Sequence, residues 1–153
     1  MRRSWLAVPL VALAVAGCGV RPSVVITGAP APSGPANGAV LYFLTDGLPV
    51  RVLRPLAEEA TMDRTIALLG AGPDETEREL RYTTEVPPGV TFVDQEGEAG
   101  RLTLTLSVNV STLSPRAVDQ IVCTVRDTLI LGPRITLRGG GSERAPQTCP
   151  LPG

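Results

Sequence analysis

The stretch RLTLTLSVNVSTLSPRAVDQIVCTVRDTL, residues 101–129, holds the two clearest structural signals of the chain. Leucine occupies every second position from Leu102 to Leu106, with polar residues between, and this alternation predicts a strand with one buried face. Ser114 then stands at a helix N-cap position, and Pro115 follows at the first helical position. The stretch therefore predicts a half-buried strand followed by a helix.

The helix after Ser114 is amphipathic, because its apolar residues recur at helical spacing. They are Val118, Ile121, Val122, Val125 and Leu129. Cys123 lies more than a quarter turn from the centre of this stripe, on the side of Asp119 and Asp127. We therefore expect Cys123 on the outer side of the helix and outside the core.

Elements before this stretch follow from turn and cap signals. VLYFL at residues 40–44, Asp46-Gly47 and the run 50–53 predict a hairpin with Pro49 at an edge or strand start. Thr61 is the expected N-cap of a helix that ends at the glycines around residue 70. Residues 74–77 form a capping box, which predicts one more short helical turn.

The remaining segments complete a simple order of elements. Residues 90–93 predict a strand, residues 94–100 an acidic turn, and Ile135 with Leu137 a last short strand. Residues 139–153 are expected to be a tail ordered only at Cys149. The order is β-β-α-β-β-α-β, which predicts an α+β fold: a small mixed or antiparallel sheet with two helices packed on one face.

The N-terminus carries the features of a secretory signal. Arg2-Arg3 precede an apolar run at residues 5–16, which is too short to span a bilayer. The following VAGC, residues 15–18, resembles a bacterial lipobox. That resemblance implies removal of residues 1–17, lipidation of Cys18, and a diacylglyceryl anchor on the outer face of the cell membrane. The alternative is a plain secretion signal that contains a cysteine. Residues 18–38 are expected to be the lipidated cysteine and a flexible tether rich in Pro, Gly and Ala.

Composition excludes several classes of function. The chain has no histidine, so it has neither an imidazole base nor an imidazole metal ligand. Without residues 1–17 it keeps 12 of 14 basic residues and all 15 acidic ones, a net charge of −3. That balance argues against nucleic acid as a partner.

Two cysteines remain beside Cys18. Outside the cytoplasm, Cys123 and Cys149 are expected to form a disulfide. The alternative is two free thiols.

Four segments together resemble the GerMN domain of sporulation and spore-germination proteins, over about residues 39–138. They are VLYFL (40–44) with Arg54, LLGAGP (68–73) with Glu77, VPPG (86–89) and QIVCT (120–124). The resemblance implies a βαββα-type fold related to ring-building motifs, with no enzymatic activity and no cofactor.

The candidate site residues concern recognition, and no catalytic or metal site is expected. Asp94, Glu96 and Glu98 lack the spacing of a calcium loop and are interpreted as a solvated acidic turn. Arg51 and Arg54 on the first hairpin are the candidate interface residues, with a solvated strand face as the alternative.

The sequence as a whole predicts a non-catalytic, lipid-anchored module of the cell envelope that binds an envelope protein or a second copy of itself. The alternative is a sensory or small-ligand-binding lipoprotein that works with a membrane kinase or transporter.

Overall fold

The structure is a computed structural model, and it describes residues 37–98, 100–129 and 134–151. Over these residues the strands divide between two sheets. The strands are β1 (Gly38–Thr45), β2 (Leu48–Pro55), β3 (Phe92–Glu98), β4 (Arg101–Leu106), β5 (Arg134–Gly139) and β6 (Ser142–Gln147). The helices are α1 (Met62–Ala71), α2 (Glu75–Glu79) and α3 (Pro115–Thr128), with a short 3₁₀ turn, η1 (Val110–Thr112).

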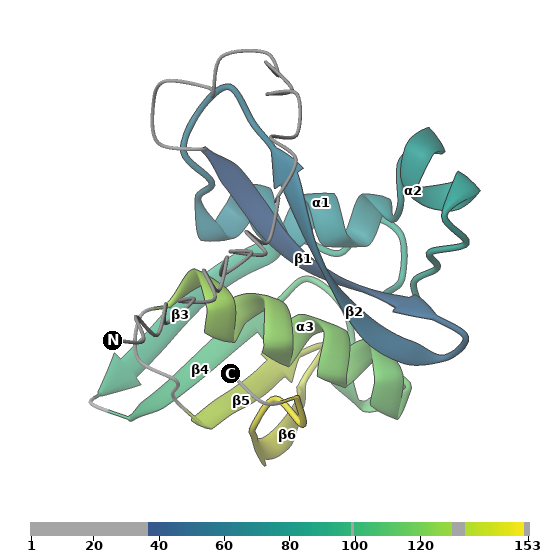
Figure 1. The fold of residues 1–153 in the computed structure, drawn as a ribbon. Coiled ribbons are helices and arrows are strands. Elements are labelled where there is room, and N and C mark those ends of the chain that lie inside the picture. The colour runs from purple at the N-terminus through teal and green to yellow at the C-terminus, as the bar shows by residue number, and fades with distance from the viewer. Residues whose placement is uncertain (1–36, 99, 130–133, 152–153) are drawn as a thin grey trace, which may run out of the picture. The chain divides into compact units, whose positions relative to one another are not determined.

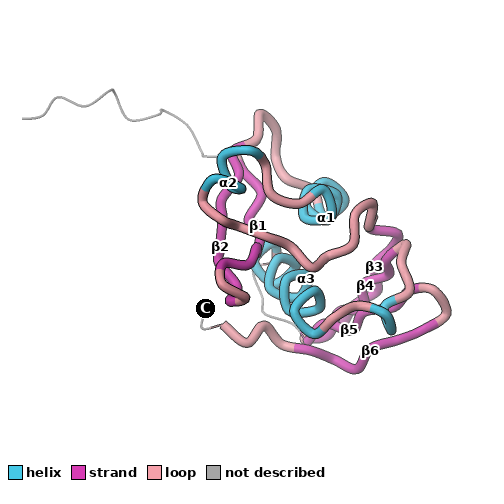
Figure 2. Tube along the Cα trace, turned by 90° about the vertical axis from the view of Figure 1, so that its right-hand side faces the viewer, coloured by secondary structure: helices cyan, strands magenta, loops and turns pink. Residues whose placement is uncertain are grey.

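The two longer helices form a layer between the two sheets. β1 and β2 pair as a separate hairpin, and β3-β4-β5-β6 form the other sheet in that order. Figure 1 shows α3 lying across the four-stranded sheet, and Figure 2 shows α1 and α3 between that sheet and the hairpin. The expected α+β class is confirmed. The prediction of a single sheet is wrong. β1 does not pair with the four-stranded sheet, because its free side is occupied by α3 and by the segment at Thr83.

The first hairpin has the predicted turn and register. Asp46 and Gly47 have φ of 50° and 77°, which fits a two-residue type I′ turn. β1 and β2 pair antiparallel from Thr45↔Leu48 outward. Pro49 lies near the start of β2, on a strand that pairs on one side only. The predicted edge position is confirmed.

The predicted helix caps are present. The Thr61 side chain accepts from Arg64 N, and the Ser114 side chain accepts from Ala117 N. Asp74 and Glu77 form the reciprocal capping box of α2. Local signals were sufficient here, because each cap satisfies a donor within three residues of it.

Two segments are more regular than the sequence indicated. Residues 94–98 belong to β3 rather than to an acidic turn. Residues 142–147 form β6, which pairs with β5 after a turn at Gly140 and Gly141, with φ of 59° and 74°. The expectation of a tail ordered only at Cys149 is therefore wrong, and the Gly-Gly pair was the hairpin signal that could have corrected it.

The core is aliphatic and draws on all three layers. It includes Leu41 and Phe43 from β1, Ile66 and Leu69 from α1, and the leucines of β4. β4 and β5 pair parallel, with α3 in the connection between them. Cys123 is fully buried, against the expectation of an outer helix face. The reason is that α3 has contacts on more sides than a helix covering a single sheet.

Candidate interaction surface

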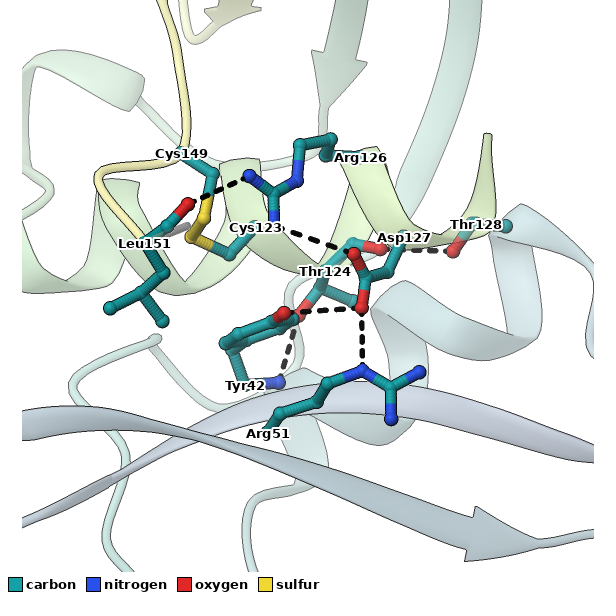
Figure 3. Close-up of polar contacts among 9 residues, drawn as sticks. All are labelled: Tyr42, Arg51, Cys123, Thr124, Arg126, Asp127, Thr128, Cys149 and Leu151. Atoms are coloured by element: carbon teal, nitrogen blue, oxygen red, sulfur yellow. Dashed lines mark hydrogen bonds and ion pairs between the residues drawn. A yellow bond between two sulfur atoms is a disulfide. The ribbon is translucent and has the colours of Figure 1, made fainter. Parts of the chain in front are cut away.

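A cluster of charged groups surrounds Asp127 at the C-terminal end of α3 (Figure 3). Tyr42 Oη donates to Asp127 Oδ2 at 3.1 Å, and Arg51 Nε donates to the same oxygen at 2.8 Å. Arg126 Nη2 lies 3.6 Å from Asp127 Oδ1. A carboxylate at a helix C-terminus is unfavourable in the field of the helix dipole, and these cations offset that cost.

The same contacts set the protonation of the cluster. Burial, followed by the hydrogen bond to Asp127, raises the pKa of Tyr42 above its ordinary value. The hydrogen bond to Asp127 also raises the pKa of Arg51. Tyr42 is therefore held as a neutral phenol, and Arg51 is a permanent cation whose side chain is 57% exposed.

The C-terminal segment crosses α3 beside this cluster. Cys123 and Cys149 form the predicted disulfide, over a sequence separation of 26 residues. Arg126 Nη1 donates to the carbonyl of Leu151 at 3.0 Å. The segment is thus held by one covalent and one polar contact to the same helix (Figure 3).

Two side chains of α3 replace a neighbouring strand along β1. Thr124 Oγ1 accepts from Tyr42 N at 3.0 Å, and Gln120 Nε2 donates to Tyr42 O at 2.8 Å. Gln120 Oε1 also accepts from Glu85 N at 2.9 Å. Both side chains are fully buried. The sequence placed them in the QIVCT segment, but only the fold reveals that they satisfy strand backbone.

Arg54 is used inside the chain. Its Nε donates to Glu77 Oε1 at 3.2 Å, its Nη2 contacts Glu77 Oε2 and donates to Gly72 O, and its guanidinium lies 5.5 Å from the Phe43 ring centroid. The side chains of Arg54 and Glu77 are only 14% and 8% exposed. Of the two candidate interface arginines, Arg51 is exposed and Arg54 is not. The structure does not bring them to one site, and their interface role stays a prediction.

The acidic residues of β3 form a different kind of surface. Alternation along the strand places Asp94, Glu96 and Glu98 on one face, and all three are exposed. Glu96 lies 3.5 Å from Arg138 of β5. Within the described residues, no group of three or more acidic or cysteine side chains has the geometry of a metal site.

A hollow of about 240 Å³ lies beside Asp127, between the start of β1 and the end of α3. Three of its polar lining residues are already engaged: Thr65 Oγ1 donates to Thr61 O, Thr128 Oγ1 donates to Thr124 O, and Asp127 accepts from Tyr42 and Arg51. Asn37 and Glu59 also line it. Pockets for small ligands usually span about 300–1,000 Å³ and offer free polar groups. At about 240 Å³ this hollow is smaller than such pockets.

No protein-family model and no curated protein sequence matches the chain. Among solved structures, the chain is similar to the tandem GerMN domains of the sporulation protein GerM from Bacillus subtilis, with a TM-score of 0.53 and 18% identity. The match covers 69% of this chain and 39% of that one. The chain has a GerMN-like fold. The resemblance in the four sequence segments is thereby confirmed at the level of the fold.

The GerMN-like fold changes how the sequence motifs are interpreted. Gln120, Thr124, Arg54 and Glu77 all lie in those motifs, and all four satisfy buried polar groups.

Cys18 and residues 1–36 lie outside the described residues. None of the described helices is long and apolar enough to cross a membrane.

Proposed function

We propose that this chain is a non-catalytic module, anchored by lipid at Cys18 on the outer face of the cell membrane, that binds another protein of the cell envelope. The observation that carries the non-catalytic part is the engagement of the buried polar groups. In a chain without histidine, the buried side chains of Glu77, Gln120 and Thr124 all hold neighbouring elements together. A catalytic acid, base or nucleophile would need to face a substrate.

The anchoring part rests on the sequence. VAGC at residues 15–18 follows a positive and then an apolar segment. Two acyl chains give stable membrane attachment where one gives only marginal attachment. The similar solved structure is that of a sporulation protein. Its similarity in fold supports a role as a binding module, and its part in sporulation is not carried over to this chain.

Anchoring is tested by growing cells with an alkyne-tagged fatty acid and measuring the tag on the purified chain. The wild-type chain is expected to carry the tag and to fractionate with membranes. Cys18→Ser is expected to lose both properties, with Glu58→Gln in the exposed loop before α1 as a control that keeps them. An untagged wild-type chain in the soluble fraction would contradict the anchor.

Binding is tested by crosslinking the anchored chain in intact cells and identifying what is captured. The proposal expects one envelope protein, or a second copy of the chain, to be enriched over a Cys18→Ser control. Enrichment of a membrane kinase or transporter together with binding of a metabolite would favour the sensory alternative. No enrichment of any protein would refute the interaction module.

A further inference from the structure

The described residues contain four strand edges, and one of them stands apart from the others. The free side of β1 is already used: Leu44 exchanges two hydrogen bonds of 2.8 Å with Thr83, and Tyr42 is bound by Gln120 and Thr124. An added strand therefore cannot pair with the backbone of Leu44 or Tyr42. The remaining edges are β2 of the hairpin and β3 and β6 of the larger sheet.

β2 and β6 carry features that hinder pairing of their edges with another strand. Hydrogen-bonded pairs alternate outward from Thr45↔Leu48, so the backbone groups of residues 49, 51, 53 and 55 face away from β1. Pro49 and Pro55 have no N–H to donate, which shortens the usable edge at both ends. β6 contains Pro146 and has a register shift opposite residues 135–137.

β3 contains no proline, and its register shift, between Phe92 and Asp94, precedes residues 94–98. Its pairing with β4 is regular from Asp94↔Thr105 to Glu98↔Arg101, and every residue from Val93 to Glu98 is exposed. The same alternation directs the backbone of Gln95 and Gly97 away from β4. The Gln95 N–H is bound by Asp94 Oδ1 at 2.8 Å. The outward groups are then the Gly97 N–H and the carbonyls of Gln95 and Gly97.

The side chains beside this edge specify the charge of a partner. Asp94, Glu96 and Glu98 form one row on the uncovered face of the sheet, next to Thr105, Thr103 and Arg101 of β4. Within this row Glu96 lies 3.5 Å from Arg138 and Glu98 lies opposite Arg101, so Asp94 is the carboxylate with no cation beside it among these strands. A second copy pairing antiparallel through its own β3 would place carboxylates opposite carboxylates, which destabilises a sheet. A strand with basic residues at every second position would place them opposite this row.

We propose that the β3 edge, residues 94–98, binds an extended segment of a partner protein with arginine or lysine at alternate positions, which adds a fifth strand to the sheet. The inference rests on the proposed interaction module, since it names where that module binds and what it binds. Backbone hydrogen bonds to Gly97 supply affinity, and the carboxylate row supplies specificity.

The test uses the full chain in detergent micelles and the fluorescent peptide Thr-Arg-Val-Arg-Val-Arg-Thr. The control peptide, Arg-Arg-Arg-Thr-Val-Val-Thr, has the same composition without the alternation. Binding is measured by anisotropy, and protection of the Gly97 amide is measured by hydrogen exchange. The charge variant is Asp94→Asn with Glu98→Gln, and its control is Glu58→Gln with Glu59→Gln in the exposed loop before α1.

The alternating peptide is expected to bind more tightly than the clustered one and to slow exchange at Gly97. Removing two cross-strand charge pairs is expected to weaken binding roughly two- to thirty-fold, while the loop variant changes it little. Equal binding of both peptides, protection at another strand, or no binding would overturn the inference.

A further outcome would also overturn it. If the charge variant dimerises while the wild-type chain does not bind the peptide, the carboxylates serve only to keep β3 from pairing with β3 of a second copy. Failure of the peptide test together with capture of an envelope protein in cells would refute the β3 edge alone. Failure of both would refute the interaction module as well.

Discussion

Thr124→Val should destabilise the chain far more than Thr128→Val, although both changes remove a hydroxyl from the same helix. Thr124 Oγ1 is the acceptor for Tyr42 N at 3.0 Å, within the buried part of the chain. Valine has the same branched shape but accepts no hydrogen bond. The Tyr42 N–H would be left buried and unpaired, which costs about 1–3 kcal/mol.

Thr128 provides the matched control. Its Oγ1 donates back to the Thr124 carbonyl at 3.0 Å, one turn earlier in α3, and the side chain is only half-buried. Water can replace that contact, so Thr128→Val should cost no more than about 0.5 kcal/mol. The difference between the two variants reports mainly the bond from α3 to β1, because both make the same Thr→Val change in α3 and only Thr124 bonds to that strand.

Urea unfolding followed by circular dichroism measures the two free energies, provided that the m-values agree. Hydrogen exchange adds a local readout, since the Tyr42 amide should lose protection beyond the global change in Thr124→Val. Midpoints that coincide within error, with unchanged protection at Tyr42, would refute the conclusion that α3 completes the edge of β1.

Three further outcomes are expected. Cys149→Ser should lower the free energy of unfolding by about 3.5 kcal/mol in the chain-entropy model. Reductant should lower the urea midpoint of the wild-type chain to that of the variant and leave the midpoint of the variant unchanged. Arg54→Met should lower the free energy of unfolding by about 3–5 kcal/mol, because it leaves Glu77 buried without its cation. In a double-mutant cycle, adding Glu77→Gln should recover part of that stability. Burial raises the pKa of Asp119, so the folded chain binds this proton more tightly than the unfolded chain. Its contribution to stability therefore falls as the pH rises through the folded pKa, and Asp119→Asn should raise the urea midpoint at about pH 7 but not at about pH 3.

The elements that the sequence predicted well are those with local causes. The cap at Ser114, the capping box at residues 74–77 and the type I′ turn at Asp46-Gly47 each satisfy backbone groups a few residues away. The division into two sheets has a non-local cause, because it depends on α3 lying along β1, about 80 residues earlier in the chain. No periodicity within either element encodes that distance.

The same non-local cause explains the error at Cys123. A helical wheel assumes one buried face, but α3 contacts the hairpin on one side, the four-stranded sheet on another and the C-terminal segment at Cys149. Residues that look polar or peripheral on the wheel, such as Gln120 and Thr124, then become fully buried. Their partners are backbone groups of β1, which have no signature in sequence.

The motif residues and the proposed binding residues therefore belong to separate parts of the chain. Gln120 and Thr124 bind the backbone of Tyr42, and Glu77 neutralises Arg54. Each of these side chains therefore satisfies a polar group that the fold itself buries. β3 lies outside all four motif segments and its residues from Val93 to Glu98 are exposed, so its charges can vary without cost to the core. Partner specificity is expected to reside in surfaces of this kind.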